Sequence, residues 1–485
     1  AYLAVRECVQ EVVDDIILPC VGRRRGFVVL GTPGIGKTTM TNWMAIRARQ
    51  EFPDARIVLD DWKKGGKWLR LIEGDEVYQV KYDDVEYDLQ RDPSMIYLAD
   101  TGGPDAPSYL PFPHAGLCVV TASPAAAPKE YLKQGWVDTV VLPPWSRKEC
   151  FAAHRGMEER NRIADTESRI FVPSREEFEK RVDEFGGIPR ILFTDRPTLL
   201  NRYRNGVNGA LGKLTPRAPT ADQEMYDTAD KLFHIYPRPK RQWVTGSYTT
   251  EFPSEQVQNR YSERLDELEF ADQVKVLQVL VGSGMNSTVL GQLVGSIFEQ
   301  GAYGAIYSRD VHTLYPLSSS LQTSSSSSLN VSFSKPERVH TQSTLLNMQK
   351  LAKGTYYAFP RNHVAIDALL AQTEGEETVV YLFQLTVNEN GHPVSSQGLY
   401  DIVQHCKKVL GGENKPLRFR LVFGLSRELL DTEAYAGSQE LKKLADQPDD
   451  VKSVLERVEQ WKVALKVDPT FDILNKRVRK AKMNQ

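Results

Sequence analysis

The sequence predicts an α/β protein that begins with a mostly parallel sheet. From Phe27 onward, short apolar runs alternate with stretches of helical periodicity, a pattern typical of parallel α/β sheets. The first apolar run also leads directly into a glycine-rich loop, and a helical pattern follows that loop. Five apolar runs are the expected strands of this sheet: residues 26–30, 55–59, 95–99, 117–121 and 139–142.

The composition narrows the class of protein. A chain of 485 residues is long enough for two or three domains. Its net charge of −2 excludes a nucleic-acid binder that is basic throughout, so any such binding must come from a local patch. No apolar run is long enough to span a membrane, so we expect no membrane span. The five cysteines are scattered and lack metal-ligand spacing, which indicates reduced thiols in a reducing compartment.

The strongest motif in the chain fits G-x-x-x-x-G-K-[ST] and reads Gly31-Thr32-Pro33-Gly34-Ile35-Gly36-Lys37-Thr38. Glycines let backbone N–H groups curl around a phosphate, and the helix that follows adds its partial positive charge. We expect Lys37 to contact the β- and γ-phosphates and Thr38 to bind Mg²⁺. The loop therefore predicts ATP or GTP with Mg²⁺ as cofactor, and the expected cofactor-binding residues are Gly31, Pro33, Gly34, Ile35, Gly36, Lys37, Thr38 and Thr39.

A second acidic group is expected to help hold the metal at the end of a neighbouring strand. Asp100 follows the apolar run 95–99 and is the candidate, although an aspartate that caps the next turn is the alternative. Thr101-Gly102-Gly103 comes next, so no acidic residue directly after Asp100 is available to activate water. Asp105 is the nearest alternative, and the sequence leaves the water-activating group unidentified.

Two further segments could reach the phosphates. The strand expected over 117–121 ends in Thr121-Ala122-Ser123-Pro124, where a polar group that senses the γ-phosphate could sit. Gly186-Gly187-Ile188-Pro189-Arg190 begins a later apolar stretch, and Arg190 is the expected catalytic arginine of this segment. A plain strand-exit turn and a solvated arginine are the respective alternatives.

With these motifs in order, the chain resembles Crinkler effectors and the related retrotransposon hot spot proteins. The segments that carry the resemblance are residues 30–37, 120–124, 142–146, 185–190 and 383–387, with His392-Pro393. The resemblance implies an NTPase similar to the signal-transduction ATPases with numerous domains, with the Gly-Ile-Pro segment in a helical lid. It also implies a second, restriction-endonuclease-like α/β domain.

The resemblance also implies a domain organisation and a cellular role. We expect a lead-in helix over 1–25, the NTPase domain with its lid over 26–200, and a helical linker over 201–285. A nuclease-like domain over 286–430 and a helical carboxy-terminal segment over 431–485 follow. Proteins of this family are secreted by eukaryotic microbes and delivered to host cells, often to the nucleus, where they promote cell death. DNA and host nuclear proteins are the implied partners.

Nucleases of the implied fold hold Mg²⁺ with an Asp on one strand and a D/E-x-K on the next, and the Lys helps to activate water. Asp367, Gln384 and Thr386 take these three positions, and Glu299 on the helix expected over 286–306 could join them. Gln384 can bind metal without carrying charge, but Thr386 cannot replace a lysine. Three readings stay open: an altered but working metal site, an inactive nuclease fold kept for DNA binding, and strand-end residues without chemistry. His392 and His405 could assist.

Other expectations concern basic tracts and helices. Residues 238–241 and 476–482 are basic and could contact phosphate backbones or direct nuclear import, or they could be ordinary solvated surface. Helices are expected over 147–161, 174–185, 220–233, 254–268, 395–410 and 434–465. Two functions follow: an effector in which ATP hydrolysis is coupled to DNA binding and Mg²⁺-dependent cleavage, or a nucleotide-switched binding protein with negligible turnover.

Overall fold

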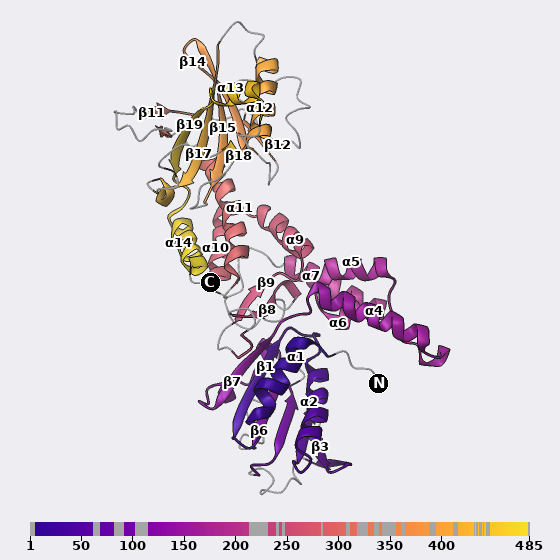
Figure 1. Ribbon diagram of the computed structural model, residues 1–485. Coiled ribbons are helices and arrows are strands. Elements are labelled where there is room, and N and C mark those ends of the chain that lie inside the picture. Colours follow the sequence, from indigo (N-terminus) through magenta and orange to yellow (C-terminus); the bar gives the residue numbers. More distant parts are fainter. Residues whose placement is uncertain are drawn as a thin grey trace. The chain divides into compact units, whose positions relative to one another are not determined.

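The protein divides into two units in the computed structural model, and each unit has its own sheet (Figure 1). Unit 1 comprises Ala1–Leu268 and Gly282–Asn286, and unit 2 comprises Glu269–Val281 and Ser287–Gln485. The structure describes residues 5–61, 68–81, 92–101, 115–212, 231–238, 242–244, 248–282, 285–306, 311–317, 328–333, 339–341, 356–359, 365–387, 394–410, 416–430, 432, 435, 439, 441–442 and 447–483.

Unit 1 is built on a seven-stranded sheet in the order β4-β3-β2-β5-β6-β1-β7. Its strands are β1 (Arg25–Gly31), β2 (Ile57–Asp61), β3 (Trp68–Glu73), β4 (Glu76–Lys81), β5 (Ile96–Asp100), β6 (Leu117–Ala122) and β7 (Val137–Leu142). Strands β2, β5, β6, β1 and β7 run parallel, and β3 and β4 form an antiparallel hairpin at one edge. The mixed α/β class with a mostly parallel sheet is therefore confirmed.

Both faces of this sheet are covered, which explains why its central strands are continuous apolar runs. On one face, α2 (Lys37–Glu51) packs against β2, β5 and β6 and buries Met40 and Met44. On the other face, Val28 and Tyr97 belong to a core cluster that also contains Tyr131 of α3 (Lys129–Leu132). Successive strand residues thus alternate between the α2 face and the α3 face, and this alternation decides which polar side chains meet at the strand ends.

Further helices of unit 1 lie before its first strand, between its strands and after its last strand. The amino-terminal segment forms α1 (Glu7–Gln10), η1 (Glu11–Ile17) and η2 (Leu18–Cys20). The later helices are η5 (Pro124–Ala126), α4 (Arg147–Ile163), η6 (Thr166–Ser168), α5 (Arg175–Phe185), α6 (Pro189–Leu192), α7 (Pro197–Gly212) and α9 (Glu255–Asp266). At the start of α4, the Ser146 side chain accepts from the backbone N–H of Glu149, whose carboxylate accepts from the backbone N–H of Ser146. This capping box fixes where α4 begins.

The predicted helical linker over 201–285 contains a β-hairpin. α7, α9 and α10 (Phe270–Gly282) are helical, but β8 (His234–Pro237) and β9 (Tyr248–Glu251) pair as antiparallel strands. Both segments contain β-branched or aromatic residues, which favour an extended chain, and pairing with each other stabilises it. Residues 213–230, with most of the helix expected over 220–233, lie outside the described residues.

Unit 2 is built on an eight-stranded sheet in the order β11-β10-β19-β17-β15-β14-β13-β12. Its strands are β10 (His312–Pro316), β11 (Leu329–Val331), β12 (Val339–Thr341), β13 (Tyr356–Ala358), β14 (Ala368–Glu374), β15 (Glu377–Thr386), β17 (Leu417–Ser426) and β19 (Glu459–Leu465). Strands β15, β17 and β19 run parallel at its centre, and β14 pairs with β15 as an antiparallel hairpin. A separate pair is formed by β16 (Val394–Ser395) and β18 (Leu441–Lys442).

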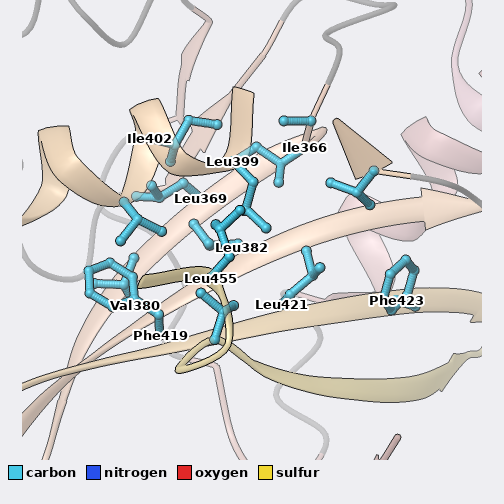
Figure 2. Packing of buried hydrophobic residues seen from close by; sticks show 14 of the residues in the cluster. Ile366, Leu369, Val380, Leu382, Leu399, Ile402, Phe419, Leu421, Phe423 and Leu455 are labelled. Atoms are coloured by element: carbon cyan, nitrogen blue, oxygen red, sulfur yellow. The ribbon is translucent and has the colours of Figure 1, made fainter. Parts of the chain in front are cut away.

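Two helices of unit 2, α11 (Ser287–Ile306) and α12 (Ser396–Leu410), contact strands of its sheet. Unit 2 also contains α10, η8 (Arg427–Leu429), α13 (Asp449–Leu455) and α14 (Pro469–Met483). The apolar residues of α12 recur with helical spacing, and Leu399 and Ile402 point from this helix toward Leu382 of β15 (Figure 2). This face of the sheet also carries Leu369 and Phe423, so it forms the main core described for unit 2.

The prediction that residues 431–485 form a helical segment is wrong for part of its length, and so is the single helix over 434–465. β19 lies between α13 and α14 and pairs with both β17 and β10. Val463 and Leu465 are buried at alternate positions, the pattern of a strand. The hydrogen-bond partners of this segment lie on neighbouring strands, so a local helical pattern in the sequence cannot predict them.

Among the described residues, no helix has both the length and the apolar character needed to cross a membrane.

Candidate functional site

The glycine-rich loop connects β1 to α2 at the carboxyl end of the sheet, where open α/β sheets bind ligands. Gly34 and Gly36 have φ angles of 90° and 104°, in the left-handed region that glycine adopts without strain. Gly36 is the N-cap of α2, and no side chain caps this helix start. The first N–H groups of α2 are therefore available to an anion.

Lys37 folds back over the loop. Its Nζ donates to the backbone oxygens of Gly31, at 2.8 Å, and of Thr32, at 3.1 Å. Burial, with a smaller contribution from the charge of Arg190, lowers the pKa of Lys37 to about 8, and the charge of Asp100 opposes this shift. The Lys37 ammonium group therefore donates only to uncharged carbonyl oxygens among the described contacts. A phosphate, which is negatively charged, would form a stronger hydrogen bond with it.

Thr38 and Asp100 are in contact, although 62 positions separate them in the chain. Thr38 Oγ1 donates to Asp100 Oδ2 from the first turn of α2. Because β6 lies between β1 and β5, Asp100 stands two strands away from the loop, within reach of the α2 start. A threonine hydroxyl and a carboxylate side by side are the donor set expected to hold Mg²⁺ and its water shell.

Thr121 lies between these groups. It is the register partner of Asp100 and is fully buried at the end of β6. Its hydroxyl donates to Asp100 Oδ1 at 3.3 Å and lies 3.3 Å from the hydroxyl of Thr41 on α2. The position proposed for a γ-phosphate-sensing group therefore adjoins the position proposed for the metal.

The segment that contains Arg190 packs directly on the loop. The Arg190 backbone N–H donates to the Gly34 carbonyl at 3.4 Å, and a Cβ on Gly34 would lie 2.9 Å from Ile188. The Arg190 side chain is exposed, and its positive charge helps to lower the pKa of Lys37. Of the remaining loop residues, Ile35 is buried, Pro33 is half-buried and Thr39 is exposed. The structure thus brings Arg190 to the loop.

Trp145 was not anticipated from the sequence. Its Nε1 donates to the Ile35 carbonyl at 2.9 Å, and its backbone N–H donates to the Gly187 carbonyl at 3.0 Å. Trp145 therefore joins the loop to the segment that carries Arg190. Its ring lies 5.6 Å from the guanidinium of Arg6, which bonds the backbone oxygens of Pro143 and Pro144.

Thr32 makes a second unanticipated contact of the loop. Its hydroxyl accepts from the backbone N–H of Ile235 in β8 at 3.2 Å. The loop is therefore held both by the Trp145 indole and by the hairpin that follows the helices. No local sequence signal marks either contact, because each depends on residues distant in the chain.

The predicted nuclease-like residues lie in unit 2 at the ends of β14 and β15. Asp367 directly precedes β14, and its Oδ2 accepts from Gln384 Nε2 at 2.7 Å and from the Leu385 backbone N–H at 2.6 Å. Burial raises the pKa of Asp367 to about 7, and the Leu385 N–H opposes this shift. Asp367 and Gln384 therefore do meet, in a buried setting that favours the neutral acid.

The third motif position, Thr386, lies two residues beyond Gln384 on the same strand face and is buried. Its hydroxyl hydrogen-bonds the side chain of Tyr435, a residue that was not anticipated from the sequence. Glu299 lies half-buried on α11. Within the ranges given above, no group of three or more His, Cys, Asp or Glu side chains is placed to hold a metal ion.

Lys462 of β19 lies on the same face of the sheet as Gln384, two strands away from β15. Register partners across β15, β17 and β19 are Gln384, Phe423 and Lys462. Lys462 Nζ donates to the backbone oxygens of Leu430, at 2.6 Å, and Tyr435, at 2.9 Å. Its charge therefore holds the chain segment that carries Tyr435 against the sheet.

The other candidate residues are dispersed. His405 is half-buried on α12, and His392 lies outside the described residues. Lys476, Arg477 and Lys480 are exposed on α14, whereas residues 239–241 of the first basic tract lie outside the described ranges. Neither a protein-family model nor a curated protein matches this chain. The resemblance to Crinkler effectors rests on the short motifs given above.

Proposed function

We propose that unit 1 binds and hydrolyses ATP or GTP with Mg²⁺ as a P-loop NTPase. The contact between Thr38 and Asp100 carries the proposal, because two residues distant in sequence meet beside the phosphate-binding loop. Lys37, held on the Gly31 and Thr32 carbonyls, supplies the positive charge for the β- and γ-phosphates.

Hydrolysis at this site would depend on positioning and electrostatics. The loop N–H groups and the start of α2 orient the phosphates, and Lys37 stabilises their charge. Thr38 and Asp100 would hold Mg²⁺, which when bound neutralises charge on the phosphate oxygens. Arg190, exposed and packed on the loop by its backbone, could add positive charge at the γ-phosphate.

The test is turnover by Lys37→Ala beside Lys129→Ala, whose lysine is exposed on α3. We expect Lys37→Ala to abolish phosphate release and Lys129→Ala to leave it unchanged. Wild-type ATPase activity in Lys37→Ala would overturn the proposal. Circular dichroism and thermal melting of both variants exclude a folding defect as the cause.

The rival function is a nucleotide switch with negligible turnover, in which the nucleotide only shifts a conformational equilibrium. Single-turnover measurements with excess protein, with and without duplex DNA, separate the two functions. A measurable chemical step favours hydrolysis, and tight binding without product supports the switch.

For unit 2 we propose DNA binding with a nuclease-like site that does not cut. The contact between Asp367 and Gln384 favours this reading, because one oxygen of the Asp367 carboxylate accepts from both an uncharged amide and a backbone N–H, and Gln384 brings no negative charge to a metal. The exposed Lys476, Arg477 and Lys480 of α14 are candidates for phosphate contacts.

Two measurements test the proposal for unit 2. Fluorescence anisotropy with duplex DNA should give binding that weakens with salt. Each Lys→Ala or Arg→Ala substitution on α14 that removes a charge from a DNA phosphate should lower the log–log salt slope by about 0.9. Plasmid nicking with Mg²⁺ that disappears in Asp367→Ala would instead establish the altered but working metal site.

The cellular setting is a proposal from the resemblance alone. We propose a secreted effector that enters host cells, acts in the nucleus with host nuclear proteins as partners, and promotes cell death. Expression of a fluorescent fusion in host cells tests it, with Lys37→Ala as the matched inactive variant. A fusion that stays out of the nucleus would contradict this setting without touching the enzymatic proposal.

A further inference from the structure

The phosphate-binding loop is held by a side chain from outside it, and this contact fixes the orientation of a peptide plane. Trp145 Nε1 donates to the Ile35 carbonyl at 2.9 Å. The C=O of Ile35 and the N–H of Gly36 belong to one planar trans peptide, so they point in opposite directions. Gly36 is the N-cap of α2. The indole hydrogen bond therefore sets the direction of an N–H group at the helix start, where a phosphate would bind.

Trp145 is itself held by a buried arginine from the segment before β1. Only 6% of the Arg6 side chain is exposed, and its guanidinium lies 5.6 Å from the centre of the Trp145 ring. Its Nη1 donates to the Pro143 carbonyl at 2.8 Å, and its Nη2 donates to the Pro144 carbonyl at 3.0 Å. Arg6 therefore contacts the face of the indole and also fixes the backbone of the two residues directly before it.

A carboxylate completes the surroundings of Arg6 and joins it to the start of α4. Arg6 Nε donates to Glu149 Oε1 at 2.8 Å, and Nη2 donates to Oε2 at 3.4 Å. Glu149 is also the capping-box residue that accepts from the Ser146 backbone N–H at 2.7 Å. Arg6 thus holds the chain on both sides of Trp145 through charge-assisted hydrogen bonds, which restrict where the indole can lie.

We propose that Arg6 is a positioning residue for nucleotide binding, because it holds the Trp145 indole that orients the phosphate-binding loop. This inference rests on the proposed NTPase function and adds a residue from outside the glycine-rich motif. Among the described residues, the hydrogen-bond partners of Arg6 are Pro143, Pro144 and Glu149, and none of them belongs to the loop. Arg6 therefore acts on the nucleotide only through other residues, and its loss should weaken binding more than it slows the chemical step.

The test is Arg6→Met, which keeps a long side chain and removes the guanidinium. We expect nucleotide Kd to rise by about 2–10-fold, the effect of losing one hydrogen bond at the loop, with kcat at saturating nucleotide within about twofold of wild type. Arg204→Met is the matched control, because Arg204 donates twice to Glu184 and lies 5.6 Å from the Phe185 ring. It removes the same kind of contacts from another part of unit 1 and should leave Kd unchanged.

A double-mutant cycle separates positioning from a general effect on stability. Trp145→Phe lacks the indole N–H that Arg6 positions, so adding Arg6→Met to Trp145→Phe should change Kd by less than about twofold. If the two losses multiply instead, Arg6 does not act through the indole, and the proposal is wrong. A wild-type Kd in Arg6→Met, or an equal rise of Kd in Arg204→Met, would also overturn it.

Arg6→Lys keeps the proposal testable if thermal melting shows that Arg6→Met does not fold. Lysine keeps a positive charge but lacks the planar fork that bonds both proline carbonyls. We expect Arg6→Lys to bind nucleotide less tightly than wild type and to lose this difference in the Trp145→Phe background; an unchanged Kd would contradict the assignment. A wild-type protein that binds no nucleotide would instead overturn the NTPase function itself, so the two failures are distinguishable.

Discussion

Each candidate site has an aspartate at the end of a sheet strand, but the two aspartates differ in burial and in hydrogen-bond partners. In unit 1, Asp100 is half-buried and accepts from two threonine hydroxyls beside a lysine and an exposed arginine. In unit 2, Asp367 is buried, and its partners are an amide and a backbone N–H. Burial raises the pKa of Asp367 to about 7.

The difference shows what makes a carboxylate available to a cation. Asp100 is partly exposed, and its hydrogen-bond partners are threonine hydroxyl groups, beside which a metal and its water shell can bind the carboxylate. Asp367 would first have to lose a proton in an apolar setting and exchange the amide of Gln384 for a metal. The comparison favours chemistry in unit 1 and binding in unit 2.

The largest expected effect is on turnover in unit 1. Asp100→Asn keeps an oxygen for Thr38 but removes the charge that would hold Mg²⁺, so we expect kcat to fall by about 10²–10³-fold. Steady-state phosphate release at saturating nucleotide measures it. Asp138→Asn, at the half-buried amino-terminal end of β7, is the control and should leave kcat unchanged. An active Asp100→Asn would remove the basis for contrasting the two sites.

The next effect is on the stability of unit 2. Asp367→Asn offers an oxygen to both Gln384 and Leu385 without a charge. Because the folded-state pKa is raised from 3.8 to about 7, the native state binds more protons than the unfolded state between these values. The free energy of unfolding of the wild type should therefore fall as pH rises from about 4 to about 7.

At pH 8 we expect Asp367→Asn to be more stable than wild type by about 2–4 kcal/mol, and the two should converge near pH 4. Urea unfolding at several pH values measures this. Glu376→Gln, exposed between β14 and β15, is the control and should keep the pH dependence of the wild type. A destabilised Asp367→Asn at pH 8 would mean that the carboxylate is needed in its ionised form, as in a working metal site.

The sequence predicts local features of both sites well. The loop from Gly31 to Thr38 and the parallel strands are encoded in adjacent residues, and Asp100 is marked by the apolar run before it. Asp367 and Gln384 could be matched because a strand pair of known spacing joins them.

Contacts that depend on the order of strands and on distant segments could not be predicted in this way. Trp145 reaches Ile35 across 110 positions, and Thr32 meets Ile235 across 203 positions. The pairing of Asp61 with Asp100 needs the knowledge that β2 lies beside β5. β19 has a polar, helix-compatible sequence, and only its neighbours β10 and β17 make it a strand.

A smaller effect concerns pH and Lys37. Burial lowers the pKa of Lys37 to about 8, and a bound triphosphate would raise it. Nucleotide binding should therefore weaken as pH rises above about 8, by up to about tenfold per pH unit, because the free protein loses its ammonium. Titration with a fluorescent nucleotide between pH 7 and 9.5 measures this change in affinity.

The control is Lys37→Arg, whose arginine stays charged over this pH range, so the nucleotide affinity of this variant should not change with pH. A flat wild-type profile would show that Lys37 does not contact the phosphates.

The smallest effect tests how the loop is held. Trp145→Phe removes the indole N–H that bonds the Ile35 carbonyl but keeps a ring beside Arg6. One such bond contributes about 0.5–1.5 kcal/mol, so nucleotide Kd should rise by about 2–10-fold with kcat little changed. Trp243→Phe removes a comparable indole bond, which goes to Glu11 and not to a residue of the loop, and should keep the wild-type Kd. Equal weakening of nucleotide binding in both variants would mean that unit 1 is destabilised as a whole. Weakening confined to Trp145→Phe would mean that the loop of unit 1 is preorganised from a distant segment, whereas Asp367 in unit 2 is held by residues of the adjacent strand.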